Sequence, residues 1–136
     1  MWFRNRKELM EKLERGGIIP LDIYAIKENE RLDLLIKKCA PFIKPYIRSG
    51  KLHLIFAYDR TVQEPPLNGW LGVQLSYKDG TNMIGISSER LKGDRASMVK
   101  TMLHEIVHLK HDGHGADFYK HFNSLIERYN ELLKLK

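Results

Sequence analysis

The segment from Arg95 to His111 most constrains how this chain can fold, because it is predicted to be an amphipathic helix that carries two histidines on one face. Asp94 is a candidate N-cap. Apolar residues at helical spacing indicate a side that packs against a core; they are Val99, Met102, Leu103, Ile106 and Val107. His104 and His108 are four residues apart and therefore lie one helical turn apart. The sequence thus places two imidazoles on one face of a partly buried helix.

These two histidines belong to the string His104-Glu105-Ile106-Val107-His108, the HExxH pattern. Imidazole is a good ligand for Zn²⁺, and this spacing lets both rings reach one ion. Glu105 stands between them, where its carboxylate can accept a proton from a reacting water molecule without binding the metal. The pattern predicts one catalytic Zn²⁺, with Glu105 as the general base.

A third ligand is expected, because a catalytic zinc usually takes three protein ligands and keeps its fourth position open. The helix should stop near Asp112, and Gly113 can adopt the positive φ that reverses the chain. A residue just after such a turn can fold its side chain back towards the metal. His114 is therefore the predicted third ligand.

Five of the six histidines fall between positions 104 and 121, so the others need an interpretation. His111 lies on the same helical face as His104 and is the alternative third ligand. We favour a solvated or outer-shell place for it at the helix C-terminus, where a partly cationic imidazole suits the helix dipole. His121 is predicted on a helix surface near the site, and His53 in a strand without a metal role.

The chain as a whole predicts an α+β fold in a single domain, residues 1–136. Helical patterns cover Trp2–Arg15, ended by Gly16-Gly17, and Glu28–Cys39, broken by Pro41 and Pro45. Three strands are expected at Lys51–Tyr58, Trp70–Tyr77 and Met83–Ser87, forming a small antiparallel sheet with a hairpin turn at Lys78–Asn82. A last helix, Ala116–Leu133, follows the HExxH helix.

Side-chain spacing also predicts which residues of these elements are buried. In the first strand, alternation puts Leu52, Leu54, Phe56 and Tyr58 on one face. The last helix is expected to bury Phe118, Phe122, Leu125, Ile126, Tyr129 and Leu133. Cys39 is expected to be a small buried residue, and the aromatic residues Trp70, Tyr58 and Tyr77 to lie in the core or at its rim.

Composition excludes several classes of protein. One cysteine can form neither an internal disulfide nor a cysteine-rich zinc site. No stretch approaches the ~20 apolar residues of a membrane span, and no apolar segment follows the basic start, so a cytoplasmic protein is expected. The net charge is +6, and residues 1–50 hold 11 Lys and Arg against 7 Asp and Glu. This excess indicates either a solvated helical face or attraction to a polyanion such as nucleic acid.

Two strings resemble a known family. The run Val99–His108, followed by His114-Gly115-Ala116-Asp117-Phe118, is similar to the core of SprT-like metallopeptidases, in which a His-Gly-x-x-Phe segment follows the HExxH helix. Ile84–Leu91 resembles the strand and turn before that helix. The likeness covers roughly residues 83–122, and the five residues between His108 and His114 are closer to WLM and YgjP-like relatives. Metzincins share this gap but carry Gly where this chain has His111.

The resemblance implies a zincin-like metallopeptidase domain with zinc ligands His104, His108 and His114, and with Glu105 as general base. It also implies an edge strand beside the active-site helix that pairs with substrate backbone. Met83–Ser87 is the expected strand, with Gly85 allowing close approach, and a plain hairpin strand is the alternative. Spartan and WLM members are associated with cleaving proteins crosslinked to DNA. A protein or peptide substrate is therefore expected, and nucleic acid through the basic N-terminal half, without the zinc ribbon common in Spartan-type members.

Two other functions stay open on the sequence alone. A zinc-dependent endoribonuclease of the YbeY kind has a similar three-histidine spacing, although that family normally has a small residue at the position of Glu105. A zinc-stabilised module that binds nucleic acid without catalysis is the second alternative.

Overall fold

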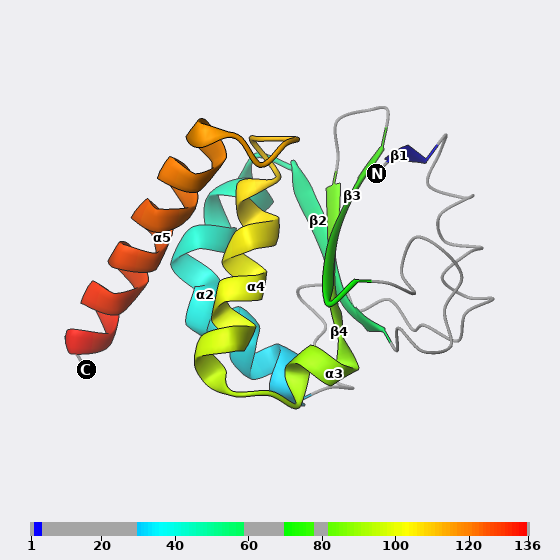
Figure 1. The fold of residues 1–136 in the computed structure, drawn as a ribbon. Helices are drawn as coiled ribbons and strands as arrows, with labels where there is room; N and C mark the ends of the chain where they lie inside the picture. Colours follow the sequence, from blue (N-terminus) through cyan, green and yellow to red (C-terminus); the bar gives the residue numbers. More distant parts are fainter. Residues whose placement is uncertain (1, 4–29, 59–69, 78–81, 136) are drawn as a thin grey trace.

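The computed structural model describes residues 2–3, 30–58, 70–77 and 82–135 (Figure 1). Their elements are β1 (Trp2–Phe3), α2 (Glu30–Arg48), β2 (Leu52–Tyr58), β3 (Gly72–Tyr77), β4 (Asn82–Ser87), α3 (Ser88–Leu91), α4 (Arg95–Val107) and α5 (Ala116–Lys134). The expected α+β class is confirmed. The helix predicted to start at Trp2 is wrong at its beginning, because Trp2 and Phe3 form a strand beside β3. The rest of that predicted helix lies outside the described residues, as does most of the predicted hairpin turn.

The sheet is mixed, with strand order β1-β3-β4-β2. β3 and β4 pair antiparallel, with Ser76 opposite Asn82, but β2 runs parallel to β4. The expectation of an antiparallel sheet is therefore wrong for β2, because alternation within a strand defines its two faces and not its neighbour. β4 lies between β3 and β2 and every one of its residues is buried. It is an interior strand, so Met83–Ser87 is not the edge that could receive a substrate.

A register shift between Leu52 and Leu54 changes which face the residues of β2 occupy. Leu52 and Ile55 both belong to the core cluster under the helices. Phe56, the next residue, points to the opposite face, where a Cβ on its partner Gly85 would lie 2.6 Å from the ring. Gly85 thus makes room for Phe56. The predicted single face of β2 is wrong, because an extra residue in a strand reverses the alternation.

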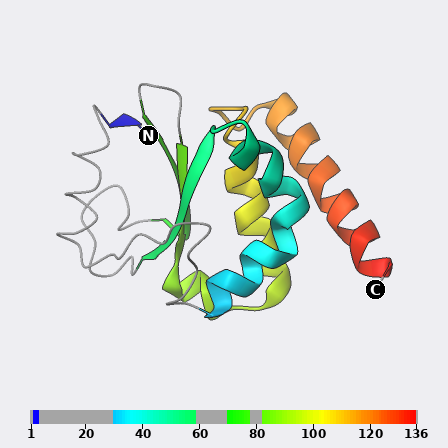
Figure 2. The same ribbon diagram turned by 180° about the vertical axis from the view of Figure 1, so that it is seen from behind.

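Helices α2 and α4 lie side by side on one face of the sheet, and α5 packs beyond them (Figures 1 and 2). α2 continues to Arg48 through Pro41 and Pro45, so the predicted break is wrong. Both prolines are exposed, where water can satisfy the carbonyls that lose their helical partners. The opposite side of α2 buries Leu35, Cys39 and Phe42, and this packing holds the helix together across the prolines.

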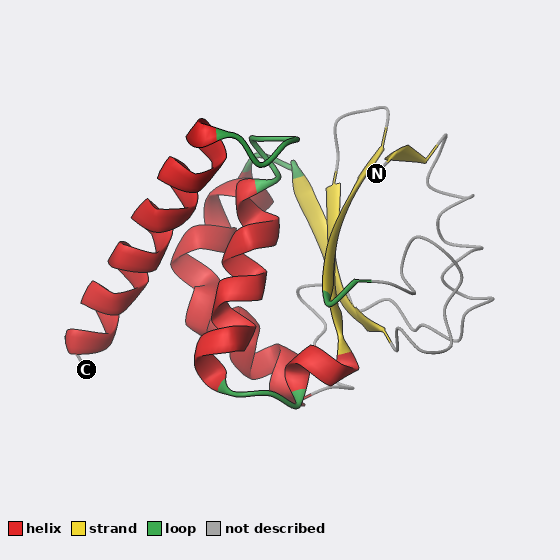
Figure 3. Cartoon of the chain, viewed as in Figure 1, coloured by secondary structure: helices red, strands yellow, loops and turns green. Residues whose placement is uncertain are grey.

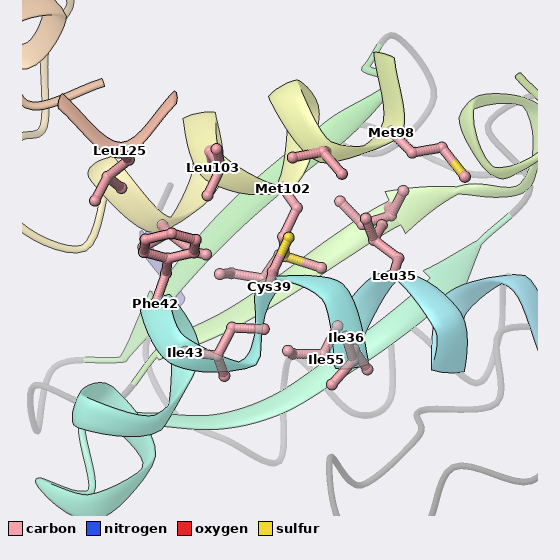
Figure 4. Packing of buried hydrophobic residues seen from close by; sticks show 14 of the residues in the cluster. Leu35, Ile36, Cys39, Phe42, Ile43, Ile55, Met98, Met102, Leu103 and Leu125 are labelled. Carbon is pink, nitrogen blue, oxygen red and sulfur yellow. The ribbon is translucent and has the colours of Figure 1, made fainter. Parts of the chain in front are cut away.

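The helical layer lies against one face of the sheet (Figure 3), and Figure 4 shows buried side chains of the core cluster. All five apolar residues predicted for the inner side of α4 are buried, and so is Cys39. In α5, Phe118, Leu125 and Tyr129 are buried, while Phe122 and Ile126 are partly buried. Leu133 is 40% exposed, contrary to expectation, because the C-terminal end of α5 extends away from the other helices (Figure 1). Among the described residues, no helix has both the length and the apolar character needed to cross a bilayer.

Candidate metal centre

The HExxH segment lies in the last turns of α4 and in the turn that follows it. Asp94 caps the helix as predicted, since its side chain accepts a hydrogen bond from the Ser97 backbone N–H at 2.9 Å. α4 ends at Val107, four residues before the predicted end. The chain then tightens, because the N–H groups of Leu109 and Lys110 donate to carbonyls three residues back. Among the described glycines only Gly50 has a positive φ, so the reversal at Gly113 is made without a left-handed residue.

This turn brings His114 back to the two histidines of the HExxH pattern. The Nε2 atoms of His104 and His108 are 3.2 Å apart, and that of His114 lies 3.1 Å from each. Nitrogens bound at about 2.0–2.1 Å to one tetrahedral Zn²⁺ are roughly 3.3 Å apart. The three atoms therefore form a triangle of the size that a single zinc ion requires, and this donor set fits such an ion.

Hydrogen bonding leaves the Nε2 lone pair of His108 free for a metal. Its other ring nitrogen, Nδ1, lies 2.9 Å from the backbone oxygen of His111. A carbonyl oxygen can only accept, so Nδ1 carries the proton and donates it. Partners of this kind orient a metal-binding imidazole and raise its basicity. The backbone of His111 thus belongs to the site.

The side chain of His111 does not join the triangle. Among the described residues, the only group of three or more histidines, acids or thiols close enough to share an ion consists of His104, His108 and His114. The His111 ring instead contacts the His121 ring, with centroids 5.5 Å apart. His53 lies in β2, as expected. The arrangement favours His114 over His111 as the third ligand.

The Phe118 ring contacts all three imidazole rings. Its centroid lies 4.9 Å from that of His104, 4.7 Å from that of His108 and 4.9 Å from that of His114. Phe118 is only 1% exposed and comes from the first turn of α5. Sequence periodicity predicted it only as a core residue. Its place three residues after Gly115, in the His-Gly-x-x-Phe string, was the signal in the sequence that it also orients the metal ligands.

Glu105 is buried beside the histidines. It is 4% exposed, and within the part of the chain that the structure describes its Oε2 atom has no hydrogen-bond partner. Burial raises the pKa of this carboxyl to about 8. A buried carboxyl with an unpartnered oxygen is costly unless a further group interacts with it. Such a group, whether a cation, a water molecule or a substrate, is therefore expected next to Glu105.

The two helical histidines are suited to be neutral ligands. Burial, together with the neighbouring His108 and His114, lowers the pKa of His104 to about 4. Burial also lowers the pKa of His108. Both imidazoles are therefore unprotonated at neutral pH, which is the state that binds metal.

An open cleft of about 870 Å³ leads to these residues between β3 and α4. Its walls include His104, Glu105, His108 and His114, together with Trp70, which is 56% exposed at the rim. β3 approaches α4 closely at Gly72, where a Cβ would lie 2.7 Å from the Thr101 Cγ2 and 3.4 Å from the Glu105 Cγ. The sequence predicted Trp70 only as a core or rim residue, and nothing in the strand pattern marked β3 as the strand beside the site.

The match to a known family covers this part of the fold. Residues 93–135 match the family model of the WLM domain. They include α4, the turn and α5, and thus all three histidines, Glu105 and Phe118. The WLM domain is of the zinc-metallopeptidase type, so the match supports a metallopeptidase and the binding of a metal. No curated protein and no solved structure matches the chain.

Proposed function

We propose that the protein is a zinc-dependent metalloendopeptidase, with His104, His108 and His114 as the zinc ligands and Glu105 as the general base. The observation that carries this proposal is the convergence of three imidazole Nε2 atoms within 3.2 Å, in a cleft that the carboxyl of Glu105 also lines. The WLM match over the same residues supports it.

Each residue has a defined task in peptide hydrolysis. Held by the three imidazoles, a zinc ion would supply the Lewis acidity that polarises the scissile carbonyl and lowers the pKa of water towards about 7. Glu105 accepts the proton of the attacking water and later delivers it to the leaving amine. Burial raises the proton affinity of the carboxyl, and the charge of a zinc ion held beside it would favour the carboxylate form that accepts the proton. The backbone oxygen of His111 orients His108, and the Phe118 ring packs against all three imidazoles.

The substrate lies along β3 rather than β4. On the side of β3 away from β4, β1 pairs only with Ser76 and Tyr77, and Gly72–Leu75 have no strand partner there among the described residues. An extended peptide can pair with this edge. Because Gly72 brings β3 against Thr101 and Glu105, such a peptide passes close to the general base.

We further propose that the protein substrates are bound or crosslinked to nucleic acid, which contacts the basic N-terminal half. In the described part of that half, α2 carries exposed Lys44 and Arg48, whereas the guanidinium of Arg31 donates to the backbone oxygens of Leu91 and Gly93. A polyanion held by such side chains releases counterions, so the affinity should fall steeply with salt. An affinity for DNA that hardly changes between low and physiological salt would show that these charges are only solvated.

The test of the peptidase is the substitution Glu105→Gln, assayed on casein. The variant should bind zinc as the wild type does and lose hydrolysis by a factor of about 10² or more. Glu127→Gln, an exposed position on α5, is the matched control and should retain activity. Undiminished cleavage by Glu105→Gln contradicts the assignment.

The same preparations separate the alternative functions. Chelator-sensitive digestion of RNA without cleavage of casein would identify an endoribonuclease. Zinc binding without turnover of either substrate would identify a non-catalytic module.

A further inference from the structure

A second cavity, of about 360 Å³, lies between the C-terminal half of α2, the end of α4 and the middle of α5. It shares no lining residue with the cleft of the metal centre. Its volume is within the range of sites that hold small organic molecules. Nothing in the proposed peptidase reaction uses it.

The polar side of this cavity is basic. Lys51, Lys110, Arg128 and His121 line it, and no aspartate or glutamate does. The C-terminal ends of α2 and α4 also face it, and each contributes roughly −0.5 of a charge. Three permanent cations outweigh those two helix ends, so the cavity keeps a positive potential that attracts an anion.

One of the cations is already oriented. The guanidinium carbon of Arg128 lies 5.1 Å from the centre of the Phe42 ring, a distance typical of a cation–π contact. Stacking holds the guanidinium plane in place and leaves its N–H groups available for an anion. Arginine favours phosphate because its donors match two phosphate oxygens at once.

His121 adds a ring nitrogen that has no hydrogen-bond partner among the described residues. It is partly buried, and its Nδ1 atom is fully covered without a hydrogen bond. Burial lowers the pKa of His121, and the nearby charges of Lys110 and Arg128 lower it further. A neutral imidazole can still donate one hydrogen bond, and the neighbouring cations favour an anionic acceptor.

The other wall of the cavity is apolar. Phe42 is buried and Tyr46 is half-buried, and the rings of Pro41 and Pro45 complete this side. A bare inorganic anion would fill the basic side and leave this wall uncovered. The combination fits a ligand with a phosphate at one end and a planar or apolar group at the other.

We propose that this cavity binds a small phosphate ester, with the phosphate against Lys110, Arg128 and His121 and the remainder against Phe42 and Tyr46. The site is independent of the metal centre and does not rest on the peptidase proposal.

Calorimetry on the metal-loaded full chain tests this with three probes: adenosine monophosphate, adenosine and inorganic phosphate. Adenosine monophosphate should bind saturably, inorganic phosphate more weakly, and adenosine not measurably. Lys110→Gln with Arg128→Gln should weaken binding by about tenfold for each lost contact. Lys120→Gln with Lys134→Gln makes the same charge change at exposed positions of α5 outside the cavity and should leave the affinity unchanged.

Three results overturn the proposal. They are the absence of saturable binding of adenosine monophosphate, equal weakening by both pairs of substitutions, and binding that survives Lys110→Gln with Arg128→Gln but disappears with a chelator. The second result would mean a diffuse attraction to the net charge. The third would place the phosphate on the metal.

Discussion

The Nδ1–H of His108 donates a hydrogen bond to the backbone oxygen of His111, across 2.9 Å. This bond connects the last turn of α4 to the turn that returns His114 to the site. It also selects the tautomer of His108 in which Nε2 carries no proton, so that the Nε2 lone pair faces the other two histidines. Because a backbone atom accepts the bond, the side chain at position 111 can change while this contact persists.

Phe118 should affect metal binding as well as stability. Phe118→Ala is expected to cost about 3–5 kcal/mol of unfolding free energy, because it empties a fully buried site. It should also weaken zinc binding by about 10–100-fold, the usual effect of losing a residue that orients metal ligands. Leu125→Ala is the control, since Leu125 is also buried in α5 and has no ring contact with the histidines. Chelator competition measures the affinity, and equal zinc affinities in the two folded variants would contradict this role.

Gly72 should be required for the close approach of β3 to α4. Gly72→Ala would bring a Cβ to 2.7 Å from the Thr101 Cγ2 and should destabilise the fold by about 1–3 kcal/mol. Combining it with Thr101→Ser should restore most of the loss, because serine lacks that methyl group and keeps the hydroxyl that donates to the Ser97 carbonyl.

Urea unfolding measures both effects of the Gly72 substitution. Gly113→Ala is the control: nothing lies within 4 Å of its Cβ position, and the change should stay within about 0.5 kcal/mol. Failure of Thr101→Ser to rescue Gly72→Ala would show that the Cγ2 contact is not the obstacle.

Glu105 should make the stability of the metal-free protein depend on pH. Burial raises the pKa of its carboxyl from 4.5 to about 8 in the folded state. Between these values the folded protein keeps a proton that the unfolded chain releases, so the unfolding free energy contributed by Glu105 falls as pH rises. Urea unfolding of the wild type and of Glu105→Gln, both in a chelator, measures this effect. The difference in unfolding free energy in favour of the wild type should shrink from about pH 4.5 to pH 8. Parallel pH curves for the two proteins would be inconsistent with a buried, ionisable Glu105.

Local patterns predicted α4 well, because its N-cap, buried stripe and histidine spacing all depend on residues within a few turns. The predicted end of α4 lies beyond the observed end, because no residue pattern indicates the tight turn after Val107. α2 persists through two prolines because the burial of Leu35, Cys39 and Phe42 outweighs two lost hydrogen bonds. That balance depends on tertiary packing, which periodicity does not contain.

The order and direction of the strands in the sheet could not be predicted from the sequence, for a similar reason. Strand alternation identified β2, β3 and β4, but the choice of β4 as the central strand depends on contacts between distant segments. The displaced alternation of β2 at Leu52 and Leu54 could not be seen in a strand read alone. Consequently the proposed substrate edge moved from β4 to β3, while His104, Glu105, His108 and His114 line one cleft, as their spacing suggested.

Metal analysis of the purified protein tests the central claim most directly. The wild type should hold one zinc ion per chain, and His114→Ala should lose it or bind it much more weakly, because two imidazoles remain. His111→Ala should keep zinc, since only its backbone oxygen contacts the site. A wild type without zinc, or an ion lost from His111→Ala and retained by His114→Ala, would contradict the three-histidine centre described here.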